Sequence, residues 1–265
     1  MSSRTDLATE ALDLAVTAAR EAGALLLERF GGPATGIEAK STRTDLVSDA
    51  DRDAERIILS RIRTAHPDDR IIAEESGTLG DPSGTRGLTW HVDPLDGTVN
   101  FLWGIPTWCV SIHAADASGD LVAVVHDPCR DETFTATPGD ARVDGTSLTM
   151  APSADLADAL IATGFAYDAA VRDIQAQVLT GVLPRVRDIR RAGSAALDLA
   201  WLAAGRVDAY YERGPKVWDW AAGGMLVREA GGELGHLDAG DAVPEGIIAG
   251  RPGLVELLRP LVDRV

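Results

Sequence analysis

Four acidic segments, far apart in the chain, have residue types that suit a divalent metal site. Each acidic residue follows or begins an apolar stretch, so each is expected at an edge of the hydrophobic core. Carboxylates gathered there would repel one another and be costly to remove from water, and a divalent cation relieves both penalties. Because no His or Cys cluster accompanies them, Mg²⁺, Mn²⁺ or Ca²⁺ is favoured over Zn²⁺. The segments are SDADRD with Asp51, AEESG with Glu74 and Glu75, DPLDGT with Asp93 and Asp96, and KVWDWAAGG with Asp219.

The stretch HVDPLDGTVNF, which begins at residue 91, has a spacing with a physical rationale. Pro94 fixes φ and removes an N–H, so it is expected to end the preceding strand. The turn can then bring Asp93 and Asp96 towards one point, while Gly97 lets the backbone approach a ligand closely. If Gly97 and Thr98 open a helical turn, its free N–H groups suit a phosphate.

Composition restricts the classes of partner. The 265 residues are 45% hydrophobic, enough for one large domain or two tightly joined lobes. With 25 basic and 41 acidic residues the net charge is −16, which disfavours nucleic acid and anionic lipid as partners. If the substrate is a phosphate, something other than general basicity must attract it, and a bound divalent cation is one candidate. No apolar run approaches the ~18 residues of a membrane span, and the N-terminus lacks a signal-peptide profile. Since Cys109 and Cys129 form no CxxC pair, we expect two small core residues in a reduced, cytoplasmic protein.

The elements that must position these acids fall into two patterns. Helical spacing predicts helices over residues 5–30 and 48–65, with Ser48 as N-cap and a loop or loose hairpin containing Lys40 between them. From Arg70 onwards, short β-like runs separated by turn signals predict an antiparallel sheet. The runs are RIIA, LTWHV, CVSIHAA, LVAVVHD and ETFTAT, with one more hairpin in TPGDARVDGTSL.

After Ala151 strand and helix patterns alternate, which predicts a second sheet covered by helices. Strands are expected in LIATGF, VDAYYE and GIIAG, and helices in VRDIQAQVLTGVLPRV, SAALDLAWLAAGR, WDWAAGGMLVREAG and GLVELLRPLVDR. We therefore predict an α+β protein with lobes at residues 1–150 and 151–265, which share one interface and form one compact unit.

Three segments, AEES, WHVDPLDGTVNFLWGIP and VWDWAAGGMLVREAGG, closely resemble the signature segments of the inositol monophosphatase family. KSTRTDLVSDADRDAE is similar to the family's N-terminal segment, and DIRRAGSAALDLAWLAAGRVDAYYE to its bacterial C-terminal segment, so the resemblance covers nearly the whole chain. Members are magnesium-dependent, lithium-sensitive phosphatases. The resemblance implies a homodimer of layered αβαβα sandwiches of the sugar-phosphatase type. Each would have an N-terminal antiparallel-sheet lobe with most metal ligands and a C-terminal mixed-sheet lobe with the substrate pocket.

The same resemblance implies roles for individual residues, with two or three Mg²⁺ ions. The first ion would be held by Glu74, Asp93 and the Leu95 carbonyl, the second by Asp93, Asp96 and Asp219, and a weaker third ion would touch Glu74. Asp51 and Thr98 would orient and deprotonate the attacking water, with Glu74 beside them. Phosphate would meet the N–H groups of Gly97 and Thr98, and substrate hydroxyls would meet Gly193, Ser194, Ala195 and Glu212. Glu75 is interpreted as a supporting residue and Ser76 as structural, while His91 and His126 are expected in strands as core or rim residues.

The implied reaction is hydrolysis of a small phosphorylated polyol, myo-inositol 1-phosphate first, by direct attack of a metal-activated water. The segment GFAYD and Lys216 depart from the animal members, which leaves histidinol phosphate and fructose 1,6-bisphosphate open as substrates. Arg190 and Arg191 would meet acids across a subunit interface or a second phosphate. Two other classes stay open: a regulatory protein that binds the transcription machinery, and a calcium-binding module, although no EF-hand loop is present.

Overall fold

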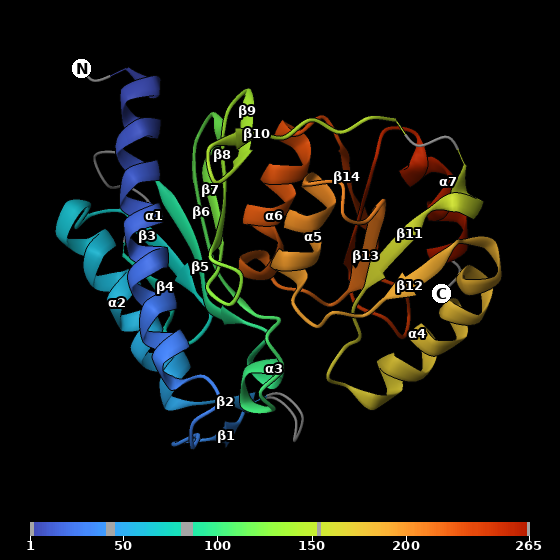
Figure 1. The fold of residues 1–265 in the computed structure, drawn as a ribbon, viewed down its shortest axis with the longest axis horizontal. Helices are drawn as coiled ribbons and strands as arrows, with labels where there is room; N and C mark the ends of the chain where they lie inside the picture. The colour runs from blue at the N-terminus through green and yellow to red at the C-terminus, as the bar shows by residue number, and fades with distance from the viewer. Residues whose placement is uncertain (1–2, 41–45, 81–86, 153–154, 264–265) are drawn as a thin grey trace.

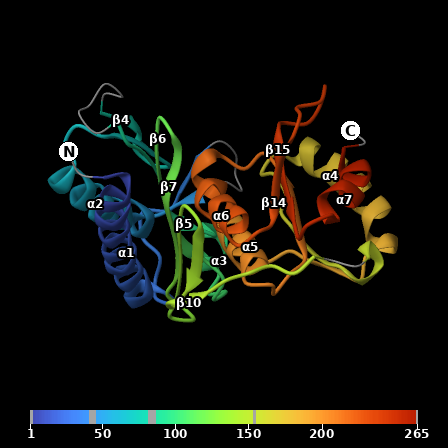
Figure 2. The same cartoon turned by 90° about the horizontal axis from the view of Figure 1, so that it is seen from above.

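The computed structural model describes residues 3–40, 46–80, 87–152 and 155–263. Five layers follow one another across the molecule, and Figure 1 and Figure 2 show them in two views. Helices α1 (Arg4–Arg29) and α2 (Asp49–Ala65) cover an eight-stranded sheet, and α5 (Ala195–Ala203) and α6 (Val217–Glu229) fill the centre. A five-stranded sheet and then α4 (Ala169–Val182) and α7 (Leu254–Val262) complete the sandwich. The predicted α+β αβαβα architecture is confirmed.

Helices α1 and α2 each begin at a serine N-cap, of which the sequence analysis predicted Ser48. Ser3 caps α1 and Ser48 caps α2, and each is answered by an aspartate three residues later, which forms a capping box. The predicted helices over residues 5–30 and 48–65 are thus confirmed to within one residue at each end. None of the helices in the described ranges combines the length and apolar character that a bilayer crossing requires.

The eight-stranded sheet has the order β10-β9-β8-β7-β6-β5-β3-β4. Its strands are β3 (Arg70–Ala73), β4 (Gly77–Leu79), β5 (Thr89–Asp96), β6 (Cys109–Asp116), β7 (Gly119–Asp127), β8 (Glu132–Thr137), β9 (Asp140–Val143) and β10 (Thr146–Ser147). All neighbours are antiparallel except β3 and β5, which are parallel. The loose hairpin between α1 and α2 is also present, as β1 (Glu38–Ala39) paired with β2 (Leu46–Val47), while residues 41–45 of the predicted loop lie outside the described ranges.

The five-stranded sheet has the order β12-β11-β13-β15-β14 and is mixed, as predicted. Its strands are β11 (Leu160–Thr163), β12 (Asp188–Arg190), β13 (Ala209–Arg213), β14 (Glu233–Leu237) and β15 (Gly246–Gly250), with short 3₁₀ turns at Leu156–Asp158 and Leu183–Arg185. Three strands, β4, β12 and β14, are missing from the sequence prediction. Each lies at a sheet edge and is mostly exposed or half-buried, so it carries no alternating apolar pattern to detect.

The central helices α5 and α6 are buried on both sides because a sheet covers each face. Gly223 of α6 lies so close to α5 that a Cβ there would stand 2.5 Å from Leu199 Cβ. Helix α6, whose first turn carries Asp219, also packs against β5, β6 and β7 of the N-terminal lobe. Cys109 is buried and Cys129 half-buried, and both are free thiols.

Candidate active site

A bulge in β5 places two of the predicted metal ligands together. Contrary to the sequence prediction, Pro94 does not end the strand: β5 continues to Asp96. In the pairing with β6, Asp93 lies opposite Ser111 and Asp96 opposite Cys109. Asp93 and Asp96 are three residues apart, whereas Ser111 and Cys109 are two apart, so β5 has one extra residue here. Residues three apart in a regular strand face opposite sides, but one extra residue restores the same side. Proline is tolerated here because the bulge needs no N–H at that position.

Glu74 comes to the same place because β3 runs parallel to β5. Its N–H donates to the carbonyl of Val92 at 3.1 Å, which sets Glu74, the first residue after β3, beside Asp93 at the bulge of β5. Asp93 is 2% exposed, and its Oδ1 accepts the N–H of Leu95 at 2.9 Å. The first implied metal set therefore lies where β3 ends beside the bulge of β5.

The C-terminal lobe brings the remaining acid. Asp219 lies in the first turn of α6 and accepts the N–H of Lys216 at 2.6 Å. The Ser111 hydroxyl donates to the carbonyl of Trp218 at 3.1 Å and thus ties this turn to β6. A second link joins the lobes through Asp96, which accepts the Ser194 hydroxyl and the N–H of Ala196, both at 2.7 Å.

The electrostatics of the four carboxylates fit a cation-binding role. Burial raises the pKa values of Glu74, Asp93, Asp96 and Asp219, and their neighbours' negative charges raise them further. For Asp96 the pKa rises to about 7 even though Ser194 and Ala196 favour its charged form. An oxygen-only donor set under such repulsion suits Mg²⁺, Mn²⁺ or Ca²⁺.

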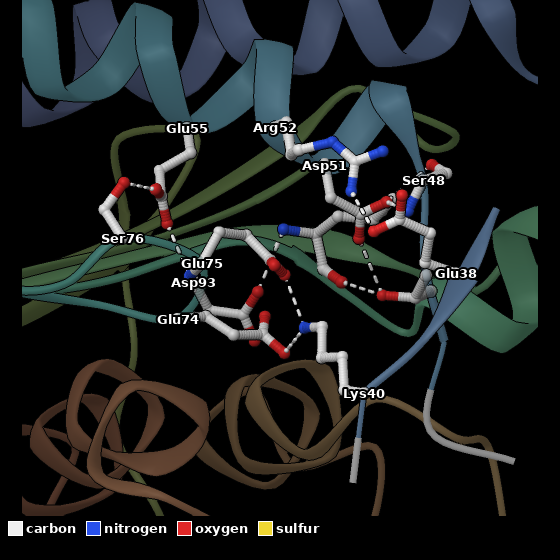
Figure 3. Close-up of polar contacts among 12 residues, drawn as sticks. Glu38, Lys40, Ser48, Asp51, Arg52, Glu55, Glu74, Glu75, Ser76 and Asp93 are labelled. Atoms are coloured by element: carbon white, nitrogen blue, oxygen red, sulfur yellow. Dashed lines mark hydrogen bonds and ion pairs between the residues drawn. The ribbon is translucent and has the colours of Figure 1, made fainter. Parts of the chain in front are cut away.

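The carboxylates are not already arranged as a finished cage, because each is oriented by a protein donor. Across the residues that the structure describes, no three Asp, Glu, His or Cys side chains form a ready metal-binding group. Lys40, at the end of the β1–β2 hairpin, donates to Glu74 at 2.7 Å and also to Glu75 (Figure 3). Burial opposes the charge on Lys40, yet the two glutamates raise its pKa, while burial raises the pKa of Glu75 to about 7. Lys40 therefore supplies positive charge beside Glu74.

Asp51 and Thr98 form the next part of the site. Asp51 is fully buried and accepts the Thr98 hydroxyl at 2.9 Å, together with the Ser48 hydroxyl at 2.6 Å and the Ser48 N–H at 2.9 Å. Burial raises the pKa of Asp51 against these favourable bonds. Gly97 has φ of +100° and caps the five-residue helix α3 (Thr98–Leu102), as its sequence context predicts. A side chain there would collide with the carbonyl of Thr107, so glycine is required.

One cavity of about 600 Å³ collects nearly all the residues singled out in the sequence. Both lobes line it, with Glu74, Asp93, Leu95, Asp96, Gly97, Thr98, Asp219, Gly193, Ser194, Ala195 and Glu212. Asp51 lies behind the wall and reaches it through Thr98. His91 and His126 do not line it: the Nδ1 atoms of His91 and His113 lie 3.0 Å apart, and His126 Nδ1 contacts the Thr133 hydroxyl at 3.1 Å.

Glu212 is held as a fixed acceptor in the C-terminal wall. The Tyr210 hydroxyl donates to its Oε2 at 2.8 Å, and Gly164 leaves room for the carboxylate because any side chain there would overlap it. Burial raises the pKa of Glu212. Ser194, by contrast, is 1% exposed and its hydroxyl is already bonded to Asp96, so it orders the wall as well as lining it.

The structure adds residues that sequence reasoning missed. Asp198 lies four residues after Ser194 and lines the cavity at 1% exposure, and among the described residues its Oδ1 has no hydrogen-bond partner. Glu55, four residues after Asp51, contacts the Glu74–Glu75 turn. Each lies four residues after a residue already singled out, Ser194 or Asp51, and this i, i+4 spacing on a helix was the signal in the sequence that could have identified it. Arg191 lines the cavity, whereas Arg190 is exposed and pairs with Asp188 of its own strand at 2.7 Å.

Comparisons with known proteins identify relatives of this chain. A family model described as the inositol monophosphatase family matches residues 7–263. The chain is 39% identical to the inositol-1-monophosphatase of Mycobacterium bovis over 98% of this chain and 91% of that protein. It is 40% identical to Nus factor SuhB of Escherichia coli K12, with 93% of each chain covered. The solved structure of inositol monophosphatase from Anabaena (Nostoc) superposes with a TM-score of 0.81 at 34% identity, covering 97% of this chain and 96% of that one.

Proposed function

Because this chain belongs to the inositol monophosphatase family, we propose that it hydrolyses a small phosphate monoester with Mg²⁺ as cofactor, and that myo-inositol 1-phosphate is its substrate. The observation that carries the proposal is the convergence of acids from β3, β5 and α6 on one cavity. One buried carboxylate (Asp93) and three half-buried ones (Glu74, Asp96 and Asp219) under mutual repulsion have no structural benefit of their own, whereas a divalent cation turns them into ligands.

The proposed ligands of the two main ions are Glu74, Asp93 and the Leu95 carbonyl for one, and Asp93, Asp96 and Asp219 for the other. Divalent ions held there would supply Lewis-acid activation of water and neutralise charge on the phosphoryl oxygens. A third, weaker ion would touch Glu74, where the Lys40 ammonium already shows that positive charge is accommodated.

Asp51 and Thr98 are proposed to handle the proton. Since Asp51 accepts the Thr98 hydroxyl, the Thr98 oxygen is directed to accept a hydrogen bond from a water in the cavity, and Asp51 takes the proton passed along this chain. Burial raises the pKa of Asp51, which makes its carboxylate a stronger base than an exposed aspartate. The N–H groups of Gly97 and Thr98 are proposed to bind phosphate oxygens at the start of α3.

The leaving alcohol is proposed to occupy the C-terminal wall of the cavity. Gly193, Ser194 and Ala195 form the turn at the start of α5, and Glu212 presents an acceptor that Tyr210 holds in place. A polyol has adjacent hydroxyls that can donate to such an acceptor, which favours inositol phosphate over an apolar ester. A homodimer and a cytoplasmic location are part of the same proposal.

A second candidate is a sugar bisphosphatase acting on a substrate such as fructose 1,6-bisphosphate. Arg191 and Lys216 line the same cavity, and neither makes an ion pair within the described ranges. Two such cations can bind a second phosphate group. The regulatory alternative, which the name Nus factor SuhB of some relatives keeps in view, is less favoured because the acidic set is intact.

A substrate panel tests the proposal. Phosphate release from myo-inositol 1-phosphate, histidinol phosphate and fructose 1,6-bisphosphate is measured as kcat/KM with Mg²⁺ or with Ca²⁺, and Asp93→Asn serves as the inactive control. The proposal expects Mg²⁺-dependent turnover that is highest on inositol 1-phosphate. Equal rates in wild type and Asp93→Asn, or no release with any ester, would refute the phosphatase assignment.

A further inference from the structure

Glu55 is a buried carboxylate on α2 with 2% exposure. It makes no ion pair with any residue that the structure describes, and hydrogen bonds engage both of its carboxylate oxygens instead. Its Oε2 accepts the N–H of Glu75 at 2.8 Å, and its Oε1 accepts the hydroxyl of Ser76. Both bonds go to the turn that follows β3, as Figure 3 shows. Burying a carboxylate is costly unless its oxygens are hydrogen-bonded, which indicates that Glu55 has a specific role at this turn.

The turn that Glu55 binds is the one that carries Glu74. The turn joins β3 to β4, and Ala73 pairs with Gly77 across it. The N–H of Glu74 donates to the Val92 carbonyl, and the next N–H, that of Glu75, donates to Glu55. The peptide groups on both sides of the Glu74 Cα are thus fixed, one by β5 and one by α2. With both fixed, the direction in which the Glu74 side chain leaves the backbone is also fixed.

Helix α2 performs a related task one turn earlier. Asp51 and Glu55 are four residues apart, so they share a face of the helix. Figure 3 shows both side chains reaching from α2 towards the site. Asp51 holds Thr98, and Glu55 holds the Glu74–Ser76 turn, so one rigid element aligns two segments that are distant in sequence.

We propose that Glu55 is a positioning residue that aims the Glu74 carboxylate at the first metal by clamping the Glu74–Ser76 turn to α2. The inference rests on the proposed function, because it takes Glu74 to be a metal ligand. Groups that orient a ligand in this way typically change metal affinity by about 10- to 100-fold when they are lost.

The test is calorimetric titration of Mg²⁺ into metal-free protein, together with the Mg²⁺ concentration for half-maximal phosphate release. Glu55→Ala is expected to weaken the tightest site by about 10- to 100-fold and to raise the half-maximal concentration in parallel, with substrate KM at saturating Mg²⁺ unchanged. Glu55→Gln keeps an acceptor for the Glu75 N–H, and its amide can donate to the Ser76 oxygen, so it should stay within a few-fold of wild type. Ser76→Ala removes one of the two bonds and should fall between them.

The matched control is Asp53→Ala, which removes a carboxylate from the same helix but from its ion pair with Arg29 rather than from the turn. It should bind Mg²⁺ as wild type does. Wild-type affinity in Glu55→Ala would overturn the inference, as would equal losses in Glu55→Gln and Glu55→Ala, because charge rather than position would then be responsible. If Glu55→Ala does not fold, the other two variants decide: weaker Mg²⁺ binding in Ser76→Ala than in Glu55→Gln supports the inference, and the reverse order overturns it. A wild type that takes up no Mg²⁺ would instead refute the proposed function.

Discussion

Neutralising Asp96 should stabilise the metal-free protein while removing its response to Mg²⁺. Asp96 is half-buried at the bulge of β5, and burial with the charges of Glu212 and Glu74 raises its pKa to about 7. Asp96→Asn keeps the shape of the side chain, and since the Ser194 hydroxyl and the Ala196 N–H both donate to Oδ2, the one amide oxygen can accept both bonds. The variant therefore removes the repulsion without creating a cavity.

The size and sign of the effect follow from the pKa. A native pKa near 7 against 3.8 in the unfolded chain is a difference of about 3 units, or about 4 kcal/mol of cost for the ionised form. Because the native pKa is the higher one, the stabilisation by the bound proton is complete below pH ~3.8 and is lost as pH rises through 7. The gain from Asp96→Asn should thus reach at most about 4 kcal/mol at pH 8 and fall to about 1.5 kcal/mol near pH 5.

The assay is thermal unfolding of metal-free protein at pH 8 and pH 5, repeated with saturating Mg²⁺. For a chain of this length the gain corresponds to at most about 10 °C at pH 8. Wild type should gain stability from Mg²⁺ by mass action, and the variant should lose most of that gain. Asp188→Asn, an exposed carboxylate paired with Arg190, should leave the melting temperature unchanged at both pH values. A lower melting temperature for metal-free Asp96→Asn at pH 8, or a shift independent of pH, would show that repulsion does not dominate this site.

Three further perturbations follow from the same geometry. Asp51→Asn should lower kcat by about 10²- to 10⁴-fold with little change in Mg²⁺ affinity, as steady-state kinetics with calorimetry would show, since Asp51 acts through Thr98; an unchanged kcat would contradict this role. Lys40→Met should tighten Mg²⁺ binding up to about fivefold in the same titration because Lys40 competes for Glu74, and weaker binding would contradict that competition. Burial and the charge of His113 lower the pKa of His91 to about 4, so its contribution to the free energy of unfolding, up to about 3 kcal/mol, is lost as pH falls from 6.5 to 4. The urea midpoint of His91→Phe should therefore fall less between these pH values than that of wild type. An equal fall in both proteins would contradict this account.

Much of the fold could be predicted from local pattern. Helices α1 and α2 are marked by apolar spacing, and α2 also by Ser48 as its cap, while β-like runs between turn signals mark the buried strands of the large sheet. The short edge strands β12 and β14 could not be found this way, because few of their side chains are buried and so little of their sequence is constrained by the core.

The candidate site was predictable as a set of residues but not as an arrangement. Pro94 in the sequence suggests a strand end, yet pairing with β6 carries the strand through it as a bulge. The bulge decides that Asp93 and Asp96 share a side. Ser194 looks like a substrate contact, yet its hydroxyl is bonded to Asp96, which only the docking of α5 against β5 could decide.

The sequence by itself determined which residues can do chemistry here, because residue type and spacing alone identify the acids, Gly97 after Asp96 and the helices that carry them. The tertiary structure alone decided what each acid faces: Lys40 beside Glu74, Thr98 on Asp51, and Glu55 under the turn. The physical reason is that local propensities act over a few residues, whereas burial, repulsion and hydrogen bonding between carboxylates depend on distances that exist only after the sheets and helices have packed.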